Sequence, residues 1–286
     1  MRQQNVTMVA FHGENKPDSL KDLLGDVLCE MARALGPEYS EAFAPFEEHQ
    51  MHATLIGMEV GAVGGQLYGH WLAKNRNGTT RVVDIERFVN LLKRLSGRDP
   101  IFTIRFAGFQ KAYCTCVGKS AEGWICATSD AEFHSCDRSA CEASFYAYAP
   151  GPAMLTGWPV RAPDRLTEFP RYLYDFRVAA EKAGFADKYH TDEAPHWMDD
   201  DCYIKLGSFK KPLERLDDLQ QRIRDYLSDR DPVTVDITAR DVSIILYSDP
   251  SLTEEAIIRR VALSEAIADA GKVPELYEEL IHGSQC

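Results

Sequence analysis

Short apolar runs and alternating apolar and polar residues mark the segments of this chain that are expected to be strands. Residues 51–58 form a largely apolar run, and residues 101–109 alternate between apolar and polar positions. Both patterns are typical of strands that are buried or half-buried. The complete set of predicted strands comprises residues 7–11, 51–58, 101–109, 113–117, 124–128, 202–209 and 233–247.

Apolar residues at helical spacing predict helices between these strands. In residues 19–35 the apolar positions recur every three or four residues. Asp18 or Ser19 can cap this helix, and Gly36-Pro37 ends it. The further predicted helices are residues 82–95, 166–183, 213–227, 253–270 and 274–281. Residues 57–69 are rich in glycine but match no phosphate-binding glycine motif, so they are expected to form a loop.

The order of the predicted elements favours an α+β fold made of two similar lobes. Both halves of the chain run roughly helix, strand, helix, strand, which suggests a duplicated lobe rather than a parallel βαβ sheet. We therefore expect one domain, with lobe one at about residues 1–150 and lobe two at about residues 151–250. The helices of residues 251–286 are expected to be peripheral.

The strand at residues 51–58 carries the first candidate for chemistry. His52 and Thr54 are two residues apart, so in a strand their side chains face the same side, while Ala53 and Leu55 face the other. An imidazole beside a hydroxyl suits a phosphate group, because one moves a proton and the other donates a hydrogen bond to an anionic oxygen. The alternative is an ordinary half-buried histidine in a strand.

The charge of the chain bears on its partners. The formal net charge is −12, and the acidic residues are spread along the whole chain of 286 residues. Such a field repels a long nucleic acid backbone, and the basic residues form only isolated doublets such as Lys210-Lys211. A small molecule is therefore the expected partner. No apolar run is long enough to cross a membrane, so a cytoplasmic protein with reduced thiols is expected.

Two groups of residues have side chains that could in principle hold a metal. The first group has no paired C-x-x-C spacing and is alternatively a set of ordinary buried cysteines; it comprises Cys114, Cys116, Cys126, His134, Cys136 and Cys141. The second is acidic and is alternatively a solvated loop; it comprises His190, Asp192, Glu193, His196, Asp199, Asp200 and Asp201. In both cases the expectation is that no metal is held.

Taken in order, four features of the chain resemble the two-histidine (2H) phosphoesterase superfamily, relatives of the 2′,5′ RNA ligases and cyclic nucleotide phosphodiesterases. They are the segment Met51-His52-Ala53-Thr54-Leu55-Ile56-Gly57, a helix, residues 100–109, and residues 240–248 after the second set of helices. The resemblance covers roughly residues 45–250. It implies two pseudo-symmetric lobes of antiparallel sheet plus helices around a central cleft. It also implies one His-x-Thr/Ser motif in each lobe, with the substrate phosphate between them.

The second motif of that family is altered in this chain. By position it falls at Tyr203-Ile204-Lys205, where Tyr203 and Lys205 stand in place of the histidine and the hydroxyl residue. A competing placement, Asp241-Val242-Ser243, keeps the hydroxyl and also lacks histidine. The first placement is preferred because a helix and a final strand follow it, as in the family. His196 is the nearest histidine that could replace the missing one.

The resemblance implies an activity that needs a base for the attacking oxygen and an acid for the leaving one. The expected function is metal-independent and cofactor-free cleavage of a cyclic or 2′-linked phosphodiester in a small nucleotide or a short RNA end. His52 would be the acid or base and Thr54 a phosphate contact, with Tyr203 as acid and Lys205 stabilising charge. The alternative is a protein on the same scaffold that binds a nucleotide or phosphorylated metabolite without cleaving it.

Overall fold

The computed structural model describes residues 3–13, 15–75, 80–109, 116–120, 123–126, 143–166, 169–186, 200–278 and 280. Within them the protein has the predicted mixed α+β fold, and every strand pairing is antiparallel. None of the helices in these ranges is long and apolar enough to span a membrane.

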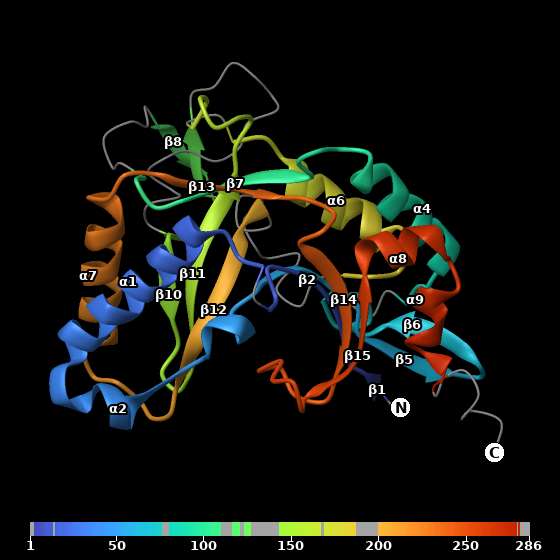
Figure 1. The fold of residues 1–286 in the computed structure, drawn as a ribbon, viewed down its shortest axis with the longest axis horizontal. Coiled ribbons are helices and arrows are strands. Elements are labelled where there is room, and N and C mark those ends of the chain that lie inside the picture. The colour runs from blue at the N-terminus through green and yellow to red at the C-terminus, as the bar shows by residue number, and fades with distance from the viewer. Residues whose placement is uncertain are drawn as a thin grey trace.

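A ten-stranded sheet forms the centre of the molecule (Figure 1). Its order is β13 (Val233–Ile237), β7 (Phe102–Phe106), β11 (Gly151–Pro159), β12 (Cys202–Phe209), β4 (Ala53–Gly57), β2 (Val6–Ala10), β14 (Val242–Tyr247) and β15 (Ile257–Ala262). Two short strands lie beside this path, β10 (Phe145–Ala147) on β11 and β3 (Phe43–Pro45) on β12. A three-stranded sheet contains β1 (Gln3–Gln4), β5 (Val60–Val63) and β6 (Gln66–Gly69). A two-stranded sheet contains β8 (Cys116–Ser120) and β9 (Gly123–Cys126).

The helices pack around the two ends of the large sheet. α1 (Asp18–Leu35) and α7 (Leu216–Ser228) pack together near β13, with α2 (Tyr39–Ala42) beyond them. α4 (Ile85–Ser96) contacts α6 (Tyr172–Glu181), α8 (Leu263–Ala268) and α9 (Lys272–Glu275), as Figure 1 shows on the opposite side. The remaining short helical segments are Gly36–Glu38, Glu48–Gln50 and α3 (His70–Asn75).

The two halves of the sheet, β13-β7-β11-β12 and β4-β2-β14-β15, join at one pair of residues. Ile204 of β12 is the Cα partner of Ala53 of β4, and no other register pair joins these two strands in the part of the chain that is described. The segments predicted as lobes exchange strands across this join. β7, from the first half of the chain, lies between β13 and β11, and β14, from the second half, pairs with β2.

The predicted loop at residues 57–69 is wrong, because this segment forms the β5–β6 hairpin. Val63 pairs with Gln66, and the two residues between them, Gly64 and Gly65, have φ values of 58° and 79°. Two consecutive positive φ angles are what a tight two-residue hairpin turn needs, and glycine adopts them without steric cost. The glycines therefore shape a turn between strands.

Two predicted helices are shorter than the sequence pattern indicated. The segment 82–95 becomes helical only from Ile85, because the Asp84 carboxylate accepts a hydrogen bond from the backbone N–H of Arg87 at 2.8 Å and caps the helix there. In the segment 166–183 only Tyr172–Glu181 is helical among the described residues.

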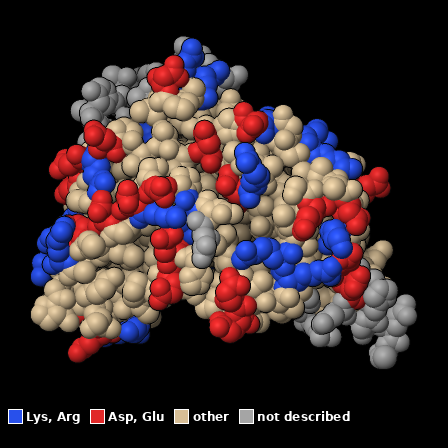
Figure 2. Space-filling view, viewed as in Figure 1, with Lys and Arg blue, Asp and Glu red and all other residues tan. Residues whose placement is uncertain are grey.

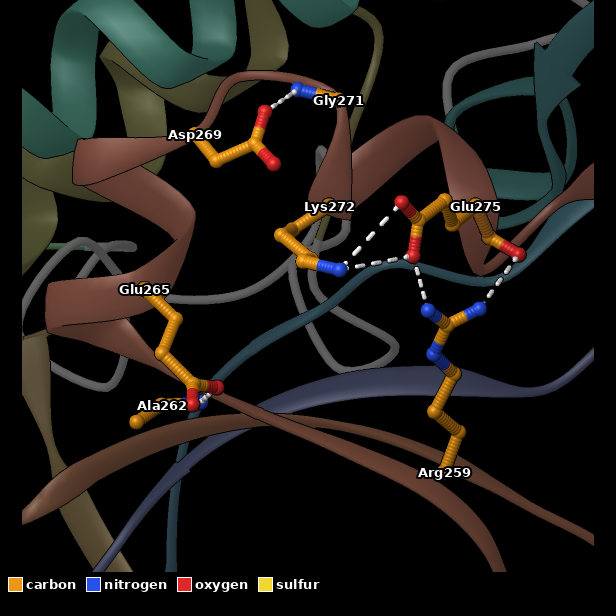
Figure 3. Close-up of polar contacts among 7 residues, drawn as sticks. All are labelled: Arg259, Ala262, Glu265, Asp269, Gly271, Lys272 and Glu275. Carbon is orange, nitrogen blue, oxygen red and sulfur yellow. Dashed lines mark hydrogen bonds and ion pairs between the residues drawn. The ribbon is translucent and has the colours of Figure 1, made fainter.

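The predicted helix at residues 253–270 is also wrong in its first half. Ile257–Ala262 is the strand β15, which pairs with β14, and only Leu263–Ala268 is helical. Figure 3 shows the polar contacts of the segment that follows. Arg259 reaches from β15 to an ion pair with Glu275, and the Lys272 ammonium lies 3.4 Å from the same carboxylate. The Arg259–Glu275 contact connects α9 to the edge strand β15.

Candidate functional site

The join between β4 and β12 brings the two predicted motifs together. Because Ala53 and Ile204 are direct antiparallel partners, His52 lies beside Lys205 and Thr54 lies beside Tyr203. Ala53 and Ile204 are fully buried in the hydrophobic core. Their neighbours therefore face the other side of the sheet, since side chains alternate along a strand.

His52 is held by a short helical turn just before β4. The turn Glu48–Gln50 places the Gln50 carbonyl oxygen 2.6 Å from Nδ1 of His52. A carbonyl oxygen only accepts, so Nδ1 carries the hydrogen and donates the hydrogen bond. The Nε2 atom is then unprotonated, with a lone pair that can accept a proton. The ring is almost completely buried, with 3% of its surface exposed.

The surroundings of His52 keep its imidazole neutral. The pKa of His52 is lowered to about 3, and burial is the largest cause of this shift. The positive charges of Lys205 and Lys16 and the proximity of His12 also lower this pKa, whereas the hydrogen bond to Gln50 raises it. The charged form of a buried imidazole is disfavoured because it loses its hydration. Near neutral pH the ring is therefore a proton acceptor and not a proton donor.

Two residues that sequence analysis did not select, His12 and Lys16, also lie at this site. The ring centre of His12 is 5.9 Å from that of His52. Lys16 is 4% exposed, its ammonium donates to the Gly13 carbonyl oxygen at 2.8 Å, and burial lowers its pKa to about 8. Both residues lie in the connection between β2 and α1, where no sequence pattern marked them.

His12 has both ring nitrogens engaged. Its Nε2 lies 3.0 Å from the Leu252 carbonyl oxygen and so donates to it, and its Nδ1 accepts a hydrogen bond from Arg260. The pKa of His12 is lowered below its ordinary value, and burial is the largest cause of this shift. His12 is therefore a second neutral imidazole, and its hydrogen bonds link the site to β15 and to the loop that precedes it.

The other predicted residues surround the join. Thr54 and Tyr203 are 8% and 4% exposed, and Lys205 is half-buried. The competing second-motif residue Ser243 lies on β14, where it pairs with Val9, which in turn pairs with Thr54. Ser243 is thus two strands away from Thr54, whereas Tyr203 is on the neighbouring strand.

A buried arginine fixes the shape of β4 at the site. The register of β4 against β2 shifts opposite Leu55, and Arg177 of α6 donates to the carbonyl oxygen of Leu55 at 3.0 Å. The same guanidinium contacts the Thr54 carbonyl oxygen at 3.5 Å and the Asp201 carbonyl oxygen at 3.0 Å. Arg177 thereby ties the strand of His52 to the start of the strand of Tyr203. Bulges of this kind often adjust the direction of a side chain beside a site.

The candidate metal ligands are only partly within the described chain. Cys116 and Cys126 are cross-strand partners in the β8–β9 hairpin. Asp200 accepts from the backbone N–H groups of Leu173 and Tyr174 at the start of α6, so it has a structural role. Outside the described residues lie Cys114, His134, Cys136, Cys141, His190, Asp192, Glu193, His196 and Asp199. No group of three or more metal-ligating side chains occurs in the described ranges.

Charge on the visible face does not form one large basic area. In Figure 2 the lysine and arginine side chains lie in small separate groups among acidic ones. The cations that act on the two imidazoles of the site include Lys16 from the N-terminal connection, Lys205 from β12 and Arg260 from β15. Such a small local group suits a compact anion better than a long polyanion.

Comparison with known proteins gives a similarity in structure and none in sequence. No protein-family model matches the chain, and no curated protein matches it significantly in sequence. The chain is similar to the crystal structure of TT0787 of Thermus thermophilus, with a TM-score of 0.36 and 12% sequence identity. The alignment covers 91% of this chain and 97% of that one. A similarity of this size carries no information about activity.

Proposed function

We propose that this protein is a phosphoesterase of the 2H type that opens a cyclic or 2′-linked phosphodiester in a small nucleotide. A short RNA end is the second candidate substrate. One observation carries the proposal: a neutral histidine with an unprotonated Nε2 lies beside Lys205 at the join of β4 and β12. A proton acceptor next to a positive charge is what attack on an anionic phosphodiester needs.

In the proposed reaction, water attacks the phosphorus and the P–O bond to the leaving oxygen breaks. Nε2 of His52 accepts the proton of the water, and the phenol of Tyr203 donates a proton to the leaving oxygen. Thr54 donates a hydrogen bond to a phosphoryl oxygen, and Lys205 stabilises its charge. Proton exchange with solvent then returns His52 and Tyr203 to their starting states.

The substrate itself adjusts the base. In the free protein the pKa of His52 is lowered to about 3, with burial as the first cause and Lys205 next. A bound phosphodiester brings a negative charge into this surrounding, and an opposite charge within a few ångströms favours the protonated form of an imidazole. Binding therefore raises the pKa of His52 towards the range in which it can take a proton from water.

A specific observation supports the second candidate, a binding protein without turnover. His12, whose ring centre lies 5.9 Å from that of His52, uses both ring nitrogens in contacts to Leu252 and Arg260. It cannot donate a proton to a leaving group without giving up one of them. In that case the same positive surrounding holds a nucleotide or a phosphorylated metabolite without cleaving it.

Hydrolysis assays separate the two candidates. The panel consists of 2′,3′-cyclic nucleotides, 3′,5′-cyclic nucleotides and 2′,5′-linked dinucleotides, each with EDTA and without added metal. Wild type is compared with His52→Ala, and His70→Ala on α3 serves as the control histidine. Turnover that persists in EDTA and is lost only in His52→Ala supports the phosphoesterase. Thermal stabilisation by a panel member that depends on His52, without turnover, supports the binding protein. Neither turnover nor stabilisation would reject both.

A further inference from the structure

A pocket of about 460 Å³ opens on the same side of the sheet as the site, between β10, β11 and α7. Tyr146, Tyr148, Thr156 and Trp158 line it on the sheet side, and polar side chains of α7 line the opposite wall, among them Gln220. Its volume is within the range of pockets that bind small molecules. Nothing in the proposed cleavage chemistry uses these residues.

The floor of this pocket has a hydroxyl group that lacks a partner. Thr156 is 0% exposed, and its hydroxyl makes no hydrogen bond to any residue in the described part of the chain. Buried polar groups are almost always hydrogen-bonded, because leaving one unpaired costs free energy. Thr156 lines the pocket, so the unpaired hydroxyl is a candidate contact for a ligand with a hydrogen-bonding edge.

The aromatic side chains give the pocket its preference for a flat ring. The Tyr146 and Tyr148 rings meet edge to face, with their centres 6.2 Å apart and their planes at 87°. Tyr148 is 56% exposed, so it is placed to cover a ligand that enters beside it. Trp158 is fully buried and packs edge to face on Phe109, so it supports the wall of the pocket. Exposed rings such as that of Tyr148 stack on the faces of heteroaromatic bases.

The pocket is close to the site at the β4–β12 join. Thr156 of β11 is the direct cross-strand partner of Tyr203, and β12 in turn pairs with β4. Thr156 is therefore separated by two strand spacings, or roughly 10 Å, from β4, which begins directly after His52. A single nucleotide spans such a distance from its phosphate to its base.

We propose that this pocket binds the heteroaromatic base of a nucleotide whose phosphate lies at His52 and Lys205. The Thr156 hydroxyl bonds to the polar edge of the base, and Tyr148 stacks on its face. The placement of the phosphate rests on the proposed function. The binding of a base stands on the pocket alone.

Nucleosides without phosphate test the pocket separately from the cleavage site. Adenosine, guanosine, cytidine and uridine are titrated by calorimetry against wild type, Thr156→Val and Tyr148→Ala, with ribose 5-phosphate as a probe that lacks a base. Thr234→Val on β13 and Tyr68→Ala on β6 are matched controls away from the pocket. The melting temperature of Thr156→Val is recorded as well, because valine removes the unpaired hydroxyl and keeps the side-chain shape.

At least one nucleoside is expected to bind wild type. Thr156→Val is expected to weaken it by roughly three- to tenfold, the effect of one lost hydrogen bond, without lowering the melting temperature. Tyr148→Ala is expected to weaken it at least about fivefold through lost stacking. The control variants and His52→Ala are expected to bind it as wild type does.

The proposal is overturned if no nucleoside binds, or if affinity is the same in Thr156→Val and Tyr148→Ala as in the controls. Its failure is distinguishable from failure of the phosphoesterase. Nucleoside binding that depends on Thr156, combined with no turnover of the cyclic nucleotides, supports the base pocket and refutes the cleavage activity. Turnover that depends on His52 but not on Thr156 or Tyr148 supports the cleavage activity and refutes the base pocket.

Discussion

The two strands that meet at the centre of the sheet carry different chemistry at corresponding positions. On the β4 side, His52 is buried, neutral and fixed in one tautomer by the Gln50 carbonyl. On the β12 side, Lys205 is half-buried and its charge lowers the pKa of His52. A neutral imidazole thus lies on one strand and a lysine charge on the other. Under the proposed function, the first strand supplies the proton acceptor, and the second supplies the charge that attracts the anion and the phenol that donates a proton.

The largest expected effect is on activity, and it compares a substitution beside β4 with one on β12. We expect His52→Ala to lower kcat/KM for the best cyclic nucleotide by about 10²–10⁴-fold, because the proton acceptor is lost. Tyr203→Phe is expected to have a smaller effect, since a water molecule can protonate the leaving oxygen in place of the phenol. Steady-state kinetics measure both variants. Equal losses would contradict this order and show that the two residues contribute equally to proton transfer.

The next effect tests the arginine that ties the two strands together. Arg177→Met removes the donors to Leu55 and Thr54 and leaves the Asp201 carboxylate, which lies 3.4 Å from Nη1, without this ion pair. We expect the free energy of unfolding to fall by about 3–5 kcal/mol, as for other broken buried pairs. Urea denaturation measures it. Arg215→Met, which breaks the exposed pair with Asp218, serves as the control and is expected to change the value little.

The buried neutral histidine also predicts how stability depends on pH. The pKa of His52 is about 3 in the folded protein against an ordinary value of 6.5, so between these values the unfolded chain binds one more proton. Stability therefore falls as the pH is lowered through this window, by about 1.4 kcal/mol per pH unit. Urea denaturation at pH 7, 6 and 5 should show this slope in wild type relative to His52→Gln. A constant difference between the two proteins would contradict it.

The smallest effect concerns the charge on β12. We expect Lys205→Met to weaken the binding of inorganic phosphate by about tenfold, because one charge-assisted contact is lost at a half-buried position. The same change should raise the pKa of His52, since the Lys205 charge lowers it in the wild type. Calorimetry measures the affinity, and NMR titration of the imidazole measures the pKa. An unchanged His52 titration would place Lys205 away from the ring.

Much of the fold could be predicted from local patterns. The spacing in residues 19–35 predicted α1, and the apolar runs predicted β2, β4, β12 and β14. The segment 253–270 failed because Ile257, Ile258 and Val261 suit a helix face as well as a strand, and pairing with β14 decides between them. That pairing is a long-range contact that no local pattern contains.

The site was predictable to the extent that it depends on one strand. Alternation along residues 51–58 placed His52 and Thr54 on one face, and the position of Tyr203-Ile204-Lys205 followed from the resemblance. His12 and Lys16 could not be predicted in the same way. They follow β2 in an irregular connection, and they approach His52 because β2 pairs with β4 and the chain then bends towards β15.

Strands from both halves of the sequence are mixed in each half of the sheet, and this arrangement has a consequence for how the chain folds. β2, near the N-terminus, has as one of its two neighbours β14, which comes from the last fifth of the sequence. A growing chain on the ribosome can therefore form the β2–β4 pair early but must leave the other edge of β2 open until β14 has been made. Contacts between such distant segments slow folding, because a long loop must close before they form. Assembly of the His52 site, which includes contacts to Leu252 and Arg260, is accordingly a late step of biosynthesis.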